Sequence, residues 1–144
     1  MSIKQLSVFM ENRPGTLLTL TGILAAHDID MRALSIVETE DFGIARIIVD
    51  DVYETATILK DEGYVSSITP VIGVYIPNVP GGMNRVLTLL ADANVNIEYM
   101  YAFLGARTSD QATMIFRVAD NAAASAALTA GGVRLIEQED VADL

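Results

Sequence analysis

The tetrapeptide Asn12-Arg13-Pro14-Gly15 near the start of the chain has a second version, Asn78-Val79-Pro80-Gly81, placed 66 residues later. The flanking sequence follows the same shift, because Asp28–Met31 falls on Asn94–Ile97 with polar residues on polar ones and apolar residues on apolar ones. Further on the shift becomes 69, since the second copy carries a longer loop. Self-similarity at a fixed spacing predicts two copies of one supersecondary unit.

Apolar periodicity predicts the same order of elements in both copies. In the first copy Pro14 suits the first position of a helix, Asp51 and Glu54 resemble a capping box that opens the second helix, and Gly63 can end that helix. The strands expected there are Ile3–Met10, Met31–Glu38, Ile44–Asp50 and Val65–Thr69, and the first helix is Gly15–His27. The second copy is expected to form strands at Val71–Ile76, Ile97–Leu104, Ala112–Ala119 and Val133–Glu137, with helices at Gly81–Ala93 and Asn121–Ala130.

This order is β-α-β-β-α-β twice, which predicts an α+β fold of two ferredoxin-like domains, each with an antiparallel sheet and two helices on one face. The expected domains are residues 1–70 and 71–144. Pro70 marks the only candidate boundary, and no flexible Gly/Ser linker surrounds it. A domain of about 70 residues is marginal alone. The two copies are therefore expected to pack together.

Composition excludes several classes of function. The chain has 144 residues, 51% of them apolar, with 9 basic against 19 acidic residues and a net charge of −10. Such a balance argues against binding of nucleic acid or of an anionic membrane surface. No cysteine and only one histidine are present, so no metal site, cofactor or catalytic residue is expected. No signal-peptide core or membrane-length apolar run occurs, which predicts a soluble, cytoplasmic protein.

Three charged regions receive structural interpretations. His27 lies at the end of the first expected helix, where a cation suits the dipole. Asp50 and Asp51 are interpreted as capping residues of the second helix. The acidic segment Glu137–Asp143 is expected to fray as a terminal tail.

The Pro-Gly turn is the candidate binding feature in each copy. A helix N-terminus presents unpaired N–H groups and the positive end of the helix dipole, where a carboxylate or phosphate fits. Gly15 and Gly81, with Gly82, would let the backbone approach a ligand closely, and the Asn12 and Asn78 side chains offer both donors and an acceptor. These groups suit a zwitterion. The alternative is that Asn before Pro-Gly is ordinary turn chemistry; recurrence of the motif in both copies favours the binding interpretation.

Val8–Gly15 resembles the first turn of an ACT domain, and Glu11–Gly15 in particular is similar to the regulatory domain of bacterial phosphoglycerate dehydrogenase. Asp28–Met31 and Asn94–Ile97 resemble the (G/N)-(I/V)-N-I segment of the same family. The resemblance covers essentially the whole chain, twice. It implies a stand-alone tandem ACT protein with no catalytic domain attached.

The resemblance also implies where a ligand would bind. ACT domains join their sheets side by side, and amino acids bind at the seam, between the β1–α1 turn of one domain and the start of the second strand of its neighbour. Carried over by position, the implied ligand-binding residues of the first copy are Glu11, Asn12, Arg13, Gly15, Thr16, Asp30 and Met31. Those of the second copy are Asn78, Val79, Gly81, Gly82, Met83, Asn96 and Ile97.

Two departures from the family pattern affect specificity. Met10 and Ile76 stand where the dehydrogenase domain has a histidine, which argues against serine and for a larger, less polar ligand side chain. Asp30 replaces the family's asparagine in the first copy, whereas Asn96 retains it in the second. Two unequal sites are therefore expected.

Three functional hypotheses follow. The favoured one is a non-enzymatic sensor that binds a free amino acid, forms a homodimer and acts on a regulated metabolic enzyme. The alternative is a dimerising interaction scaffold with degenerate pockets. A small enzyme on the same scaffold is the weakest, because the chain lacks a phosphate-binding loop, a cysteine and metal-ligand spacing.

Overall fold

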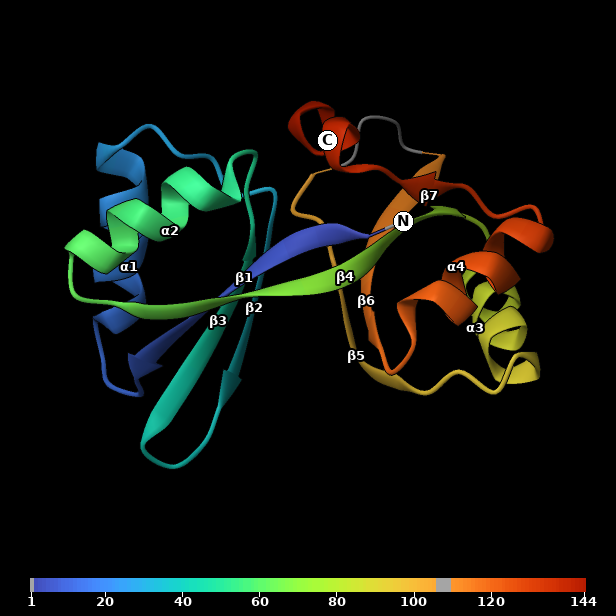
Figure 1. Cartoon of the computed structure of the whole chain (residues 1–144), viewed down its shortest axis with the longest axis horizontal. Coiled ribbons are helices and arrows are strands. Elements are labelled where there is room, and N and C mark those ends of the chain that lie inside the picture. Colours follow the sequence, from blue (N-terminus) through green and yellow to red (C-terminus); the bar gives the residue numbers. More distant parts are fainter. Residues whose placement is uncertain (1, 106–109) are drawn as a thin grey trace. The chain divides into compact units, whose positions relative to one another are not determined.

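The chain forms two compact units in a computed structural model that describes residues 2–105 and 110–144 (Figure 1). The first unit is Lys4–Thr69, and the second is Pro70–Leu144, to which residues 2–3 also belong. The chain passes from one to the other within a single strand, β4 (Val65–Pro77). The prediction of separate strands on either side of Pro70 was therefore wrong. The Pro70 carbonyl accepts hydrogen bonds from the side chains of Arg117 (2.9 Å) and Asn121 (3.3 Å), so its acceptor is satisfied.

The first unit contains one four-stranded sheet in the order β2-β3-β1-β4, with β3 antiparallel to both β1 and β2. Its two helices lie on one face of this sheet (Figure 1). Leu6, Val8 and Ala45 from the strands and Leu20, Leu24 and Leu59 from the helices share its buried core. The elements are β1 (Ile3–Glu11), α1 (Thr16–Ala26), β2 (Ala33–Glu38), β3 (Phe42–Ile48) and α2 (Val52–Asp61).

The second unit repeats this arrangement in the order β5-β6-β4-β7. It has a core of its own, in which Ile72 and Phe116 meet Leu90 and Leu128. The order β-α-β-β-α-β therefore occurs twice, as predicted, with β4 serving both copies. The elements are α3 (Gly82–Asp92), β5 (Ile97–Ala102), β6 (Gln111–Val118), α4 (Asn121–Ala130) and β7 (Leu135–Ile136), followed by the 3₁₀ helix η1 (Gln138–Asp143).

The polar residues that mark the repeat terminate helices. Asp28 and Asn94 follow α1 and α3, and both adopt the left-handed conformation with φ of 56°. The next N–H in each copy returns to the helix, from Ile29 to the Leu24 carbonyl and from Val95 to the Leu90 carbonyl, both at 2.9 Å. Asp and Asn are among the few residues other than glycine that enter this region readily. The matched segments thus reflect one shared helix-ending geometry.

The C-terminal segment is ordered. Glu137 caps η1, and its own N–H donates to the Asp140 carboxylate at 3.0 Å, which completes a reciprocal capping box. Val141 is fully buried. The prediction that Glu137–Asp143 frays was wrong, because one apolar side chain among the acidic residues anchors the segment.

Candidate functional site

The Pro-Gly sequence forms a type II β-turn in both units. Gly15 has φ 87° and ψ −9°, and Gly81 has φ 86° and ψ −6°. The Thr16 N–H donates to the Arg13 carbonyl at 3.3 Å, and the Gly82 N–H donates to the Val79 carbonyl at 3.0 Å. Proline suits the second position of such a turn and glycine the third. Pro14 therefore precedes the helix cap and does not open the helix, contrary to the sequence prediction.

Gly15 and Gly81 leave the backbone accessible at the helix N-termini. A Cβ atom built on either glycine would meet no atom within 4 Å, and neither helix has a side-chain cap. The first N–H groups of a helix have no partner inside it. Each turn thus presents donors beside open space, where an anionic group can approach.

Gly82 has a different role from the one expected. A Cβ built on it would lie 2.2 Å from the Pro77 carbonyl oxygen, and the residue is buried. The absence of a side chain allows α3 to pack against the end of β4. Gly81 remains the open glycine of the second turn.

The first turn is fastened to the β2–β3 connection by Asn12. Its amide nitrogen donates to the Glu38 carboxylate and to the Thr39 carbonyl, both at 3.2 Å. Its backbone N–H donates to the Asp41 carbonyl at 3.2 Å, as that of Asn78 does to the Asp110 carbonyl at 2.9 Å. The Asn12 donors are thus committed within their own unit, which gives this side chain a structural role.

The two turns carry different charges. Glu11 and Arg13 form an exposed ion pair across the first turn, and Thr16 donates its hydroxyl to the Arg13 carbonyl. The equivalent positions of the second turn are the uncharged Pro77 and Val79. The first turn is therefore zwitterionic and the second largely apolar.

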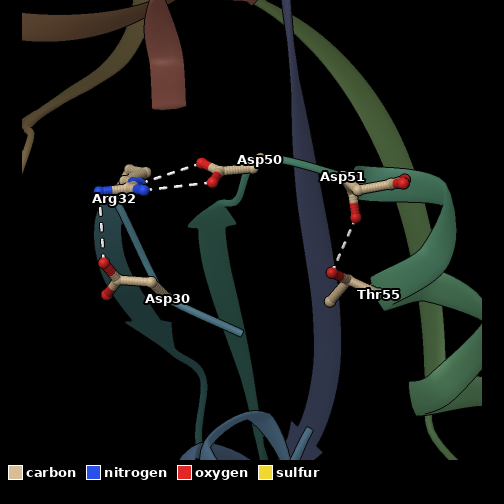
Figure 2. Close-up of polar contacts among 5 residues, drawn as sticks. All are labelled: Asp30, Arg32, Asp50, Asp51 and Thr55. Carbon is tan, nitrogen blue, oxygen red and sulfur yellow. Dashed lines mark hydrogen bonds and ion pairs between the residues drawn. The ribbon is translucent and has the colours of Figure 1, made fainter. Parts of the chain in front are cut away.

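The candidates at the start of the second strand also differ between units. Figure 2 shows the polar contacts of those in the first unit. Asp30 forms an ion pair with Arg32 at 3.3 Å, and Arg32 makes two hydrogen bonds to Asp50, at 2.9 and 3.1 Å. Asp51 alone caps α2, by accepting from the Glu54 N–H at 3.0 Å, so the joint capping role predicted for Asp50 was wrong. In the second unit Asn96 is exposed, and Glu98 replaces Arg32 at the matched position.

Within either unit the candidates of the Pro-Gly turn and those at the start of the second strand lie at opposite ends of the sheet. Glu11, before the first turn, pairs with Phe42 at the start of β3, whereas Ala33 at the start of β2 pairs with Ile48 at its end. Six residues of strand separate the two ends by about 20 Å. The structure therefore does not bring the turn and the strand start of one unit together.

Several candidates contribute to packing. Met31 packs against the core of the first unit, and Met83 and Ile97 pack against that of the second. Ile76 is 2% exposed and belongs to the second core. The expectation of a larger ligand side chain then depends on Met10 alone, which lines a pocket beside the first turn.

That pocket and its counterpart escaped the sequence analysis. A cavity of about 450 Å³ in the first unit and one of about 390 Å³ in the second each lie beside the Pro-Gly turn, next to the loop that follows α2 or α4. Their linings correspond through the repeat shifts. Phe9, Arg13, Thr19, Phe42, Tyr64 and Val65 line the first, at the positions of Tyr75, Val79, Arg85, Gln111, Val133 and Arg134 in the second.

Other classes of site find no support in residues 2–105 and 110–144. No group of three or more metal-ligating side chains occurs there. The helices of this part are too short or too polar to cross a membrane. His27 forms the C-cap of α1, with its Nδ1 3.0 Å from the Ile23 carbonyl oxygen, so its role is structural.

Comparison with known proteins identifies the family. The model of the ACT domain pair matches residues 1–144. The crystal structure of protein BT0572 from Bacteroides thetaiotaomicron is 38% identical with a TM-score of 0.92, over 100% of this chain and 98% of that one. The ligand-free regulatory subunit of aspartate kinase from Thermus thermophilus shares the fold at 17% identity and a TM-score of 0.66, over 89% of this chain and 91% of that one. A search of curated proteins gave no match. The chain, with its two βαββαβ units, belongs to the family of ACT domain pairs.

Proposed function

We propose that this protein is a non-enzymatic regulatory protein that binds a free amino acid at its Pro-Gly turns. The open backbone at Gly15 and Gly81 is the observation that carries the proposal. A carboxylate placed there would accept hydrogen bonds from the N–H groups that follow Thr16 in α1 or Gly82 in α3, because the N–H groups of Thr16 and Gly82 themselves close the β-turns. It would also lie at the positive end of the helix dipole. The family is typically one of small-molecule-binding regulatory domains.

A complete site requires two ACT units. The strand starts with Asp30 and Asn96 lie about 20 Å from the turn of their own unit, so a turn can meet such a strand start only in another unit, of the same chain or of a second copy. The ligand ammonium would be placed near an oxygen of Asn96, Asp30 or the turn asparagine. We propose a homodimer as the assembly that contains such seams.

The sites would be unequal for an electrostatic reason. The charge of Asp30 is already balanced by Arg32 at 3.3 Å, and Glu11 is balanced by Arg13. In the second copy Asn96 offers a neutral amide, and Pro77 and Val79 carry no charge. A zwitterion would therefore bind more tightly where Asn96 takes part, since no ion pair has to be broken.

Regulation of a metabolic enzyme would follow from a change in packing between units upon binding. The regulatory subunits of aspartate kinase from two Thermus species share the fold, and we propose an analogous regulatory role here. Such a change is an equilibrium between two packing arrangements of the units. A ligand can shift it only by the difference in the ligand's affinity for the two arrangements.

A thermal-shift screen of the full chain against the twenty amino acids tests the proposal. A ligand present at 100 times its Kd stabilises the native state by about 2.7 kcal/mol, which gives a clear rise in Tm. The rise should be lost in Asn78→Ala and kept in Asn84→Ala, a matched change on the exposed side of α3.

The proposal of amino-acid binding would be overturned if no amino acid raised the Tm at concentrations increased in 10-fold steps up to about 10 mM. If light scattering then showed a stable dimer, the dimerising scaffold with degenerate pockets would be the function that remains. The use of both Asn12 donors inside their own unit is the observation that favours this second candidate.

A further inference from the structure

The pocket beside the second turn lies wholly inside the second unit. Its walls come from the Pro-Gly turn, the first turn of α3, the start of β6 and the Gly131–Arg134 loop after α4. The volume of about 390 Å³ falls in the range of small-molecule sites. It shares Val79, Gly81 and Gly82 with the proposed turn site, and its described lining includes no residue from the strand start at Asn96.

Two arginines give this pocket its chemistry. Arg85 on α3 donates from its guanidinium to the Gly131 carbonyl, which holds it against the loop. Arg134 lies over the ring of Tyr75, with its guanidinium carbon 4.6 Å from the ring centroid. Guanidinium groups bind carboxylates and phosphates through paired N–H donors. Gln111 adds an amide, and none of the described lining residues is acidic.

Neither arginine has a carboxylate partner among the described residues. In contrast, Arg13, Arg32 and Arg117 all form ion pairs with acidic side chains. Glu137 and Asp140, which line another pocket together with Arg134, are engaged in the capping box of η1. Two unpaired cations in one pocket are notable in a chain with a net charge of −10.

The equivalent pocket of the first unit lacks this charge. Thr19 stands at the position of Arg85, and Val65 stands at that of Arg134. Phe42, 62% exposed, replaces Gln111. The charges that line the first-unit pocket, Glu11 and Arg13, pair with each other, whereas the second-unit pocket is cationic. The repeat therefore supplies a natural control for the two arginines.

We propose that the second-unit pocket binds a small organic anion, with Arg85 and Arg134 holding its carboxylate or phosphate group. Tyr75, Val79 and Val133 would contact the body of the ligand. Both guanidiniums are anchored by their contacts to Gly131 and Tyr75, which lowers the entropy lost when they bind an anion. The first-unit pocket would not select an anion.

Titration of the full-length protein with sodium pyrophosphate or sodium succinate, at constant ionic strength, tests the proposal. The two probes distinguish a phosphate ligand from a carboxylate ligand. For the better probe we expect saturable shifts of the Arg85 and Arg134 Nε–H signals in ¹⁵N NMR spectra. The double variant Arg85→Thr/Arg134→Val, which installs the residues of the first unit, should weaken binding at least fivefold. Lys60→Ala removes an exposed cation of the first unit and should leave the affinity unchanged.

The proposal is overturned if neither probe saturates, if the double variant weakens binding less than fivefold, or if Lys60→Ala weakens it equally. Should the double variant fail to fold, the shifts of the two Nε–H signals in the unmodified protein decide alone. The first turn at Gly15 keeps all its residues in the double variant, so an amino-acid thermal shift should persist there. Failure of this pocket and failure of the turn sites therefore remain distinguishable.

Discussion

Arg32 and Asp50 join the start of β2 to the segment after β3 through two parallel hydrogen bonds, from Nε at 2.9 Å and from Nη2 at 3.1 Å (Figure 2). The Arg32 side chain is 20% exposed, against 46% for Asp50. The Arg32 N–H also donates to the Ile48 carbonyl at 2.7 Å. This residue therefore fixes the strand start that precedes β2, including the position of Asp30.

Replacement of Arg32 by Ala should lower the free energy of unfolding by about 1–2 kcal/mol, because a bidentate charge-assisted pair is lost from a half-buried position. Arg32→Lys should recover only part of this, since an ammonium cannot form the planar pair. Urea denaturation measures both. Arg13→Ala removes an exposed pair and should change stability by less than about 0.5 kcal/mol; equal losses in the two alanine variants would contradict this ranking.

Gly82→Ala should destabilise the protein by about 1–3 kcal/mol, because the added methyl would overlap the Pro77 carbonyl and force α3 away from β4. Gly22→Ala, in the exposed interior of α1, should stabilise by about 0.5–1 kcal/mol, since nothing lies within 4 Å and alanine favours the helix. The opposite signs are measured as changes in denaturation midpoint. A neutral Gly82→Ala would show that α3 does not pack closely on β4.

Val141→Ala should cost about 1–2 kcal/mol, since it removes buried apolar volume from the C-terminal 3₁₀ helix. Ala142→Ser, at an exposed neighbouring position, should be neutral. Amide hydrogen exchange provides a second measurement, because the tail amides should lose protection only in the Val141 variant. Unprotected tail amides in the unmodified protein would restore the frayed tail that the sequence predicts.

Asn12→Asp should destabilise the first turn by about 1–2 kcal/mol at neutral pH, because it removes the donor to Thr39 and places a carboxylate beside Glu38. Glu38→Gln in the Asn12→Asp background should restore part of this loss, and added salt should reduce it. Chemical denaturation at two salt concentrations provides the test. An unaltered midpoint would mean that the contact of Asn12 with the β2–β3 connection contributes no stability.

The repeat was predictable from sequence because each element depends on local chemistry. Asp51 and Gly63 bound α2 as expected, with Asp51 accepting from the Glu54 N–H and the Tyr64 N–H returning to the Leu59 carbonyl. Apolar spacing placed Leu20 and Leu24 in the core. Errors arose where one residue type serves several purposes. Pro70 was interpreted as a break between strands, yet it lies within β4, because its carbonyl finds partners on the distant residues Arg117 and Asn121.

The sequence by itself determined the two βαββαβ units and their turns at Gly15 and Gly81, because turn type, helix ends and strand alternation follow from neighbouring residues. Only the tertiary structure decided what those turns face. It placed each turn about 20 Å from the strand start of its own unit and committed the Asn12 donors to Glu38 and Thr39. It also brought Arg85 and Arg134 to one pocket across 49 residues of chain. Such proximity depends on packing between distant elements, which local pattern does not encode.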